Sequence, residues 1–472
     1  MIERRDFYGR LVSSLLFPLH ERLKGHASVA LRRELEETQW WDAERIAALR
    51  TARLKAMLSK IERDVPYYQQ RFAELGFAAA DLRNEDDLSR LPLLDKATIR
   101  AHTPAMKAMS ARGLIRYNTG GSSGEPLVFF IGEGRVSHDV AAKWRATRWW
   151  GVDIGDREAV VWGSPVELTR QDRLRKLRDR VLRTTLLPAF EMSPERLDAF
   201  VDALLRLRPR ILFGYPSALA FIGRHARERG IDLRGIGVEV AFVTSEKLYE
   251  DQRRSIAETF GCRVADGYGG RDAGFIAHEC PQGRLHLSAE DIVVEIVGND
   301  GRRLPYGEAG EIVVTHTRTA DFPFLRYRTG DIGVLSEERC ACRRGLPVLA
   351  RVEGRSTDLV YAADGTAMHG LALIYVLRDL EGIRQFRIVQ ESLGETRVEI
   401  VAGEGFGQNT SRAIEQGLRR RLGASVRVIV ERVPRIATEA SGKFRYVQSR
   451  VIPPEAQRAP GAARTAVGAE QA

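Results

Sequence analysis

The sequence predicts an α/β fold: a large N-terminal domain of mostly parallel sheets with helices plus antiparallel strands, followed by a small mobile α+β C-terminal domain. Between residues 150 and 270, short apolar runs alternate with segments of helical periodicity, as in strands joined by crossover helices. After residue 353, three strand-like runs surround one amphipathic helix. A chain of 472 residues is long enough for this organisation and for a sizeable core.

The first hundred residues are predicted to be mainly helical and to cap or wrap the core. Apolar residues between Leu49 and Ile61 recur at near-helical spacing before Pro66. The apolar run 11–19 follows several arginines, but serines and Pro18 interrupt it and no small-residue cleavage site follows. We interpret this run as a surface helix and not as a secretion signal.

The large domain is expected to extend to residue 353 around a sheet. Its predicted parallel strands are 159–162, 211–213, 238–243 and 262–265, with helices at 217–229 and 248–260. Ligands of such sheets usually bind beyond the carboxyl ends of the strands, which directs attention to Gly214, Tyr215 and the segment 267–272. Alternating runs at 292–297 and 311–315 predict antiparallel strands beside this sheet.

The small C-terminal domain is predicted to span residues 359–452, after a hinge at 354–358. Its strands are expected at 386–389, 396–401 and 426–430, around a helix with Ile414, Leu418 and Leu422 on one face. Residues 453–472 are rich in Ala, Gly and Pro and are predicted to form a disordered tail.

Composition and charge exclude several classes of protein. The net charge of +10 comes from arginines spread over the whole chain, and the arginine-rich stretch 170–183 lacks the interleaved aromatic residues of a nucleic-acid groove. We therefore predict no nucleic-acid partner. No stretch approaches the roughly 20 apolar residues of a transmembrane helix. Four cysteines without an export signal predict a cytoplasmic protein with reduced thiols.

A loop rich in glycine and hydroxyl residues lies between two apolar runs and suits phosphate binding, because glycines let backbone N–H groups approach an anion. It is not a Walker A loop, since no G-K-[ST] follows. A flexible hairpin and a hydrolase nucleophile elbow centred on Ser122 are alternatives. The strand-like run 127–131 argues against the elbow, which requires a helix there. The residues of this loop are Thr119, Gly120, Gly121, Ser122, Ser123 and Gly124.

Five ordered motifs resemble those of the adenylate-forming enzymes: the loop at 119–126, Y-G-G-R-D at 268–272, Y-R-T-G-D at 327–331, G-R-S-T-D at 354–358 and S-G-K at 441–443. Over residues 60–452 the chain is most similar to the phenylacetate–CoA ligase family. The segments F-G-Y-P-S at 213–217 and C-A-C-R-R-G-L-P at 340–347 resemble the branch associated with capsular-polysaccharide loci.

The resemblance implies a two-step reaction in which ATP and a small-molecule carboxylate form an acyl-adenylate, and an acceptor, most often coenzyme A, displaces AMP. The glycine-rich loop would hold the phosphates and Asp331 the two ribose hydroxyls, while Arg355 would support the ribose or a phosphate. Tyr268, followed by Gly269, would stack on adenine. Gly214 and Tyr215 would line the site of the acid.

Three further roles follow from the resemblance. Asp272 would help to place Mg²⁺, although the family usually has Glu there, and Leu127 stands where a lysine commonly follows the loop. Thr357 and Asp358 would form the hinge. Lys443 would be catalytic: it is the only lysine after Lys247 in a chain with nine lysines, and a compact ammonium fits between a carboxylate and the α-phosphate.

A structural Zn²⁺ site is predicted from three of the four cysteines and one histidine. The patterns C-x5-H and C-x-C supply the four sulfur and nitrogen ligands of a closed tetrahedral site. Unconnected cysteines are the alternative interpretation. The predicted ligands are Cys280, His286, Cys340 and Cys342.

Other functions stay open at the level of sequence. The acceptor could be an amine or a sugar amine in place of coenzyme A, which would make the protein an adenylating amide-forming ligase. The unusual Asp272 and Leu127 also allow a nucleotide-binding protein without catalytic activity.

Overall fold

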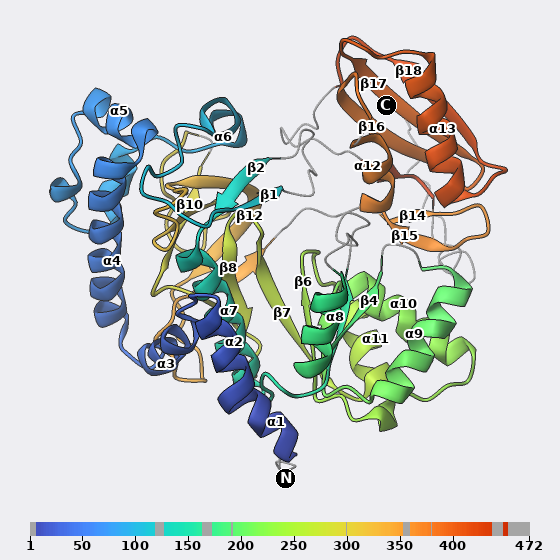
Figure 1. Cartoon of the computed structure of the whole chain (residues 1–472), viewed down its shortest axis with the longest axis horizontal. Helices are drawn as coiled ribbons and strands as arrows, with labels where there is room; N and C mark the ends of the chain where they lie inside the picture. Colours follow the sequence, from blue (N-terminus) through green and yellow to red (C-terminus); the bar gives the residue numbers. More distant parts are fainter. Residues whose placement is uncertain are drawn as a thin grey trace, which may run out of the picture. The chain divides into compact units, whose positions relative to one another are not determined.

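The computed structural model describes residues 6–118, 127–162, 172–189, 192–298, 300–352, 359–378, 380–436 and 447–451. They form two compact units, one before residue 353 and one after residue 358, each with its own sheet and core (Figure 1). The α/β class predicted from the sequence is confirmed. The predicted hinge and the predicted tail lie outside the described residues. No helix in the described ranges has both the length and the apolar character needed to cross a bilayer.

Helices dominate the N-terminal region, as expected. Asp42 caps the longest of them, α4, by accepting a hydrogen bond from the backbone N–H of Arg45. Helix α5 begins at Pro66, and Gly76, in the left-handed conformation, caps its C-terminus. The helices are α1 (Phe7–Leu11), the π-helical turn η1 (Val12–Leu16), α2 (Phe17–Leu23), α3 (Ser28–Thr38), α4 (Ala43–Asp64), α5 (Pro66–Leu75), η2 (Ala79–Asp81), η3 (Glu85–Arg90) and α6 (Lys96–His102). A hairpin of β1 (Ile115–Asn118) and β2 (Val128–Ile131) follows.

One continuous sheet of eleven strands forms the centre of the large unit. Its order is β10-β11-β12-β13-β9-β8-β7-β6-β5-β3-β4, and the five strands at the β4 end are parallel. These are β3 (Glu158–Trp162), β4 (Thr184–Pro188), β5 (Ile211–Gly214), β6 (Val240–Thr244) and β7 (Arg263–Gly270). Sequence reasoning missed β4 and ended β7 five residues early.

Helices connect the parallel strands. Those after β3 are α8 (Asp172–Val181), α9 (Pro194–Leu207), α10 (Pro216–Glu228), η5 (Arg234–Ile236) and α11 (Glu250–Phe260). Their apolar faces and the parallel strands share one core, which includes Leu204, Leu219 and Phe260. Helix α7 (Glu133–Trp149) precedes β3 and contacts β8.

The other half of the sheet is antiparallel. It consists of β8 (Gly274–Glu279), β9 (Leu285–Leu287), β10 (Ile292–Val297), β11 (Gly310–His316), β12 (Tyr327–Ser336) and β13 (Val348–Val352). Residues of α4 and α5 such as Leu58 and Phe72 share a core with Ile292, Ile312 and Tyr327 of this half. Helices α4 and α5 therefore cover the antiparallel half of the sheet, as Figure 1 shows.

The small unit contains a four-stranded sheet of order β18-β17-β16-β19. Ile414, Leu418 and Leu422 of its helix α13 are fully buried, as their spacing predicts. Its elements are β14 (Leu359–Tyr361), β15 (Ala367–His369), α12 (Leu371–Arg378), β16 (Ile383–Ser392), β17 (Glu395–Ala402), α13 (Gln408–Leu422), β18 (Arg427–Arg432) and β19 (Val447–Ser449).

Candidate active site and metal centre

Several predicted site residues meet at the carboxyl edge of the parallel strands. Gly214 is the last residue of β5 and Tyr215 follows it, while Tyr268 and Gly269 lie near the end of β7. Asp272 follows two residues after β7 ends. The parallel pairing of β5, β6 and β7 places these strand ends beside one another.

Tyr268 and Asp331 contact each other directly, although 63 residues separate them. The Tyr268 hydroxyl donates to Oδ2 of Asp331 over 3.1 Å and lies 3.4 Å from Oγ1 of Thr329. Burial, reinforced by the Asp331 carboxylate, raises the pKa of Tyr268 well above its ordinary value, so the hydroxyl keeps its proton and remains a donor. Sequence reasoning did not select Thr329, even though it belongs to the Y-R-T-G-D motif.

Asp272 is held in place by its neighbours. The Tyr327 hydroxyl donates to Oδ2 over 2.5 Å and the Ala273 backbone N–H donates to Oδ1 over 3.1 Å. These two hydrogen bonds fix the orientation of the carboxylate.

Arg135 of α7 holds the backbone of the loop that carries Asp272. The guanidinium donates to the backbone oxygens of Arg271 and Asp272, each over 3.1 Å, and Nε lies 3.0 Å from both oxygens of Asp139. Arg135 is 1% exposed. No sequence signal distinguishes it from the other 63 arginines.

Two of the predicted site glycines are required by close packing. A Cβ on Gly214 would lie 2.4 Å from the backbone oxygen of Val161, and a Cβ on Gly269 would lie 2.2 Å from the backbone oxygen of Gly274. Only glycine fits at these positions without backbone movement. The aromatic ring of Tyr215 stacks on Trp162, the last residue of β3, at 4.4 Å between centroids. Trp162 occupies the same sheet edge and could have been selected by the strand-end rule.

A small internal cavity of about 20 Å³ lies beside the ends of β6 and β7, between Thr244, Gly267 and His278. Burial, reinforced by the carboxylate of Glu279, raises the pKa of the adjacent Asp266 to about 6. Burial lowers the pKa of His278 to about 3, so its ring is neutral. The cavity has room for only a water-sized group.

The predicted metal ligands converge. The Sγ atoms of Cys280 and Cys340 lie 3.6 Å apart, Sγ of Cys342 lies 3.2 Å from Nε2 of His286, and the four donor atoms are all within 4.8 Å of one another. Cys280 follows β8, His286 belongs to β9, and the other two cysteines lie in the loop between β12 and β13. The antiparallel half of the sheet therefore brings together four residues that span 63 positions of sequence.

The tautomer of His286 suits a metal. Its Nδ1 lies 3.0 Å from the backbone oxygen of Leu346, which can only accept, so the proton is on Nδ1 and the lone pair of Nε2 faces the cysteines. Burial lowers the pKa of this ring to about 4 and keeps it neutral. Donor type, position and tautomer thus fit a closed tetrahedral Zn²⁺ site.

A second group of metal-ligating types, His138, Asp139 and His316, also has its donor atoms within 4.8 Å of one another. Nδ1 of His316 accepts the backbone N–H of Arg318 over 3.3 Å, so Nε2 of the neutral ring carries the proton and offers no lone pair. Asp139 already pairs with Arg135. We interpret this cluster as structural, because Asp139 pairs with Arg135, which in turn bonds the loop that carries Asp272.

The comparisons with known proteins agree with the geometry. A family model for the CapK C-terminal domain matches residues 360–450. Protein CapK from Staphylococcus aureus is 23% identical over 376 residues, which cover 77% of this chain and 81% of CapK. A phenylacetate-coenzyme A ligase from Thermus thermophilus is 25% identical over 375 residues, which cover 77% of this chain and 83% of that enzyme. Over about three quarters of its length the chain is similar to CapK and to the phenylacetate–coenzyme A ligases.

The chain shares its fold with a solved structure. A 2-hydroxyisobutyryl-CoA ligase in complex with 2-HIB-AMP and CoA superimposes with a TM-score of 0.62 and 22% identity, covering 88% of this chain and 91% of the ligase. The resemblance to the phenylacetate–coenzyme A ligase family that the motifs indicated is confirmed.

Ten of the twenty predicted site residues lie outside the described part of the chain. Their assignments rest on the motifs alone and stay predictions. They are Thr119, Gly120, Gly121, Ser122, Ser123, Gly124, Arg355, Thr357, Asp358 and Lys443.

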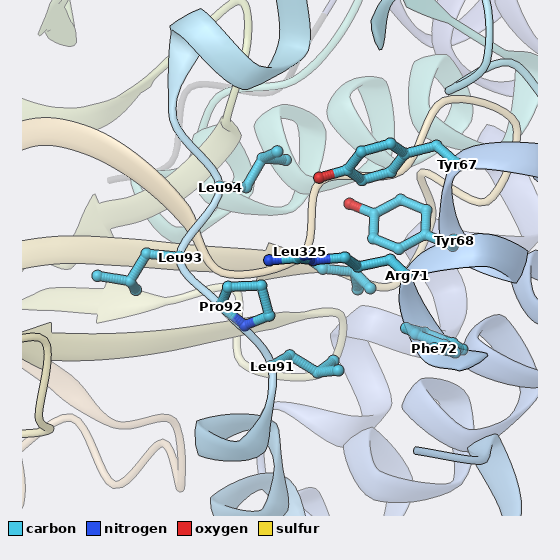
Figure 2. Close-up of a pocket in the computed structure, with 9 residues that line it drawn as sticks. All are labelled: Tyr67, Tyr68, Arg71, Phe72, Leu91, Pro92, Leu93, Leu94 and Leu325. Atoms are coloured by element: carbon cyan, nitrogen blue, oxygen red, sulfur yellow. The ribbon is translucent and has the colours of Figure 1, made fainter. Parts of the chain in front are cut away.

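One further pocket lies among the N-terminal helices, apart from every predicted site residue. Tyr67, Tyr68 and Arg71 extend from α5 toward the segment 91–94 (Figure 2). Its volume of about 20 Å³ corresponds to a water-sized space. We assign it no ligand.

Proposed function

We propose that the protein is an ATP-dependent, AMP-forming ligase that activates a carboxylic acid as an acyl-adenylate and transfers the acyl group to the thiol of coenzyme A. The observation that carries the proposal is the Tyr268–Asp331 pair at the carboxyl edge of the sheet. It joins an aromatic ring and a carboxylate, two groups that suit a nucleoside. The kinship with phenylacetate–coenzyme A ligases supports the same activity.

The nucleotide is bound by groups of complementary chemistry. The two oxygens of Asp331 accept hydrogen bonds from the two ribose hydroxyls, and the ring of Tyr268 stacks on adenine. The bond from Tyr268 to Asp331 fixes both groups before the nucleotide arrives, which reduces the ordering cost of binding. The loop 119–124 and Arg355 hold the phosphates.

Two substitutions at two centres make up the reaction. A carboxylate oxygen of the acid attacks the α-phosphorus of ATP and pyrophosphate leaves. The sulfur of coenzyme A then attacks the acyl carbon, loses its proton, and AMP leaves. Lys443 offsets negative charge at the α-phosphate in the first step. Gly214 and Tyr215 line the site of the acid, where the stacked pair Tyr215–Trp162 is a rigid wall.

Asp272 would hold Mg²⁺ through a carboxylate oxygen, a ligand type that this cation prefers, and the cation would neutralise charge on the departing pyrophosphate. Its side chain is one methylene shorter than glutamate, and the bonds from Tyr327 and Arg135 hold its loop. These fixed partners favour a defined position for the carboxylate.

We further infer that Cys280, His286, Cys340 and Cys342 bind one structural Zn²⁺. The distances between their donor atoms and the His286 tautomer support this assignment. The loop that carries the two cysteines also reaches the N-terminal helices, because the Gly345 backbone N–H donates to the backbone oxygen of Gln39 over 2.9 Å. The metal would therefore fix the contact between that loop and the helical region. Reduced thiols and the use of ATP and coenzyme A favour a cytoplasmic location.

The test of the function is the exchange of labelled pyrophosphate into ATP across a panel of aryl, aliphatic, hydroxy and amino acids. We expect at least one acid to support exchange, and Asp331→Ala to abolish it. A folded wild-type protein that binds ATP but is silent with every acid would contradict an adenylating enzyme and favour a non-catalytic nucleotide-binding protein.

The acceptor is settled in a second assay with the responding acid. Coenzyme A should yield a thioester together with stoichiometric AMP. Transfer to amines or amino sugars, without transfer to coenzyme A, would make the protein an amide-forming ligase.

A further inference from the structure

The N-terminal helix carries a row of apolar side chains that the described part of the chain leaves uncovered. Helix α1, the turn η1 and helix α2 follow one another without a break, and residues 7, 11, 15, 19 and 23 are all Phe or Leu. Phe7 is 82% exposed, Leu15 55%, Leu19 50% and Leu23 79%. Isolated exposed leucines are common on proteins, whereas a continuous row of this kind indicates an interaction surface.

The π-helical turn helps to keep this row straight. In an α-helix each step of four residues turns about 40° beyond a full turn, so residues spaced by four spiral around the axis. The wider turn over Val12–Leu16 takes up part of this excess, because its hydrogen bonds join residues five apart. The apolar side chains therefore remain on one side of the helix.

The opposite side of the same helix is anchored in the large unit. Val12 is fully buried, and the ring of Phe17 packs edge-on against Trp144 of α7 with 5.0 Å between centroids. A Cβ on Gly9 would lie 3.2 Å from the backbone oxygen of Gly155. The helix cannot roll its exposed side into the core without losing these contacts.

Helix α8 extends the exposed surface. The Tyr8 hydroxyl donates to the backbone oxygen of Val181 over 3.0 Å, and Arg183 pairs with Asp6 over 2.7 Å. These contacts place the end of α8 beside α1. Leu177 is 60% exposed and Val181 38% exposed.

The two segments are strongly cationic. Residues 6–24 and 172–183 together hold nine Arg or Lys and four Asp or Glu, a net charge of +5. Half of the chain's net charge of +10 thus falls on 31 of its 472 residues. Arg10, Arg22 and Lys24 are exposed beside the apolar row.

We propose that this surface, the docking patch formed by Phe7, Leu15, Leu19, Leu23, Leu177 and Val181 with its flanking cations, binds the surface of an anionic lipid bilayer. An exposed apolar stripe bordered by Arg and Lys is the composition of a helix that lies in a membrane interface. Anionic headgroups attract such a polybasic region, and each Arg or Lys near the surface adds to the attraction. A second copy of this chain is a poorer occupant, because pairing would bring the exposed Arg10, Arg22 and Lys24 of both copies together.

Sedimentation of the full-length protein with lipid vesicles tests the proposal. We expect binding to vesicles of phosphatidylcholine with phosphatidylglycerol, weak binding to phosphatidylcholine alone, and release by high salt. The variant Leu15→Ser, Leu19→Ser, Leu23→Ser should bind about tenfold more weakly or worse. A matched control, Met109→Ser with Leu205→Ser, changes exposed apolar residues elsewhere and should bind like the wild type.

A charge-reversal pair separates the electrostatic contribution. Arg10→Glu with Arg22→Glu should reduce binding to anionic vesicles, whereas Arg206→Glu with Arg302→Glu, an equal change of charge on other surfaces, should reduce it far less. Thermal unfolding checks that each variant is folded. Equal binding to neutral and anionic vesicles, or no binding to either, would overturn the proposal. So would a dimer in analytical ultracentrifugation that the serine variant abolishes.

Discussion

The substitution Asp331→Ala tests the proposed nucleotide site most directly. The carboxylate is expected to accept two ribose hydroxyls, and a hydrogen bond to a charged group contributes about 1.5–3 kcal/mol. Two lost bonds would cost about 3–6 kcal/mol. The substitution also removes the acceptor of the Tyr268 hydroxyl. This hydroxyl still lies 3.4 Å from Oγ1 of Thr329 and can form a hydrogen bond with one ribose hydroxyl instead. We therefore expect the lower end of this range, a rise in the Kd for ATP of about 100-fold.

Isothermal calorimetry with ATP alone measures the effect. Asp331→Asn is the matched control, because it keeps one acceptor oxygen beside Tyr268 while removing the charge. It should give an intermediate loss of about tenfold. Affinity for the carboxylic acid should change little in either variant. A folded Asp331→Ala protein whose Kd for ATP lies within about threefold of wild type would refute the reasoning and move Asp331 out of the nucleotide site.

Three other predictions concern the metal, the lysine and the pH. Metal analysis of the wild type should find one zinc per chain. The double variant Cys340→Ser, Cys342→Ser should lose the zinc together with thermal stability. A zinc-free wild type purified under reducing conditions would count against the site. Lys443→Ala should abolish acyl-adenylate formation yet spare transfer from supplied acyl-adenylate, and equal loss of both half-reactions would point to misfolding. Burial raises the pKa of Asp266 from 3.8 to about 6, so its ionisation lowers stability progressively as the pH rises from about 4 to 6. Asp266→Asn should therefore be more stable than wild type near pH 8, by up to about 3 kcal/mol in denaturant titration, and equally stable below about pH 4.

The parallel half of the sheet was predictable because its signals are local. Apolar runs of four or five residues and amphipathic helices recur there at regular spacing, and β5 (Ile211–Gly214) was predicted to within one residue. Strand β4 was missed because Thr184–Pro188 is short, directly follows the arginine-rich helix α8 and ends in proline. The extension of β7 to Gly270 was missed because glycines weaken a strand pattern. Position 269 nevertheless requires glycine, because a Cβ there would lie 2.2 Å from the backbone oxygen of Gly274.

The candidate site was predictable where a side chain has a chemistry of its own. Motif and spacing selected the Tyr268 ring, the Asp331 carboxylate and the four Cys and His residues by their chemical type, and the structure brings Tyr268 to Asp331 and the four Cys and His residues to one another. Arg135 could not be selected in this way. Its role arises from burial and from two backbone oxygens 136 and 137 positions away, which no local pattern in an arginine-rich chain encodes.

The N-terminal helices obtain their partners late in synthesis. Arg50 of α4 donates to the backbone oxygen of Ala289, 239 residues later, and Arg344 reaches Gln39 across 305 residues. At about 5–20 residues per second, a ribosome needs roughly 15–60 s to make 300 residues. For that time the apolar faces of α4 and α5 have no sheet to cover. Until β10–β13 emerge from the ribosome, these apolar helix faces can associate with other chains. Chaperones would therefore affect the yield of folded protein most during this interval.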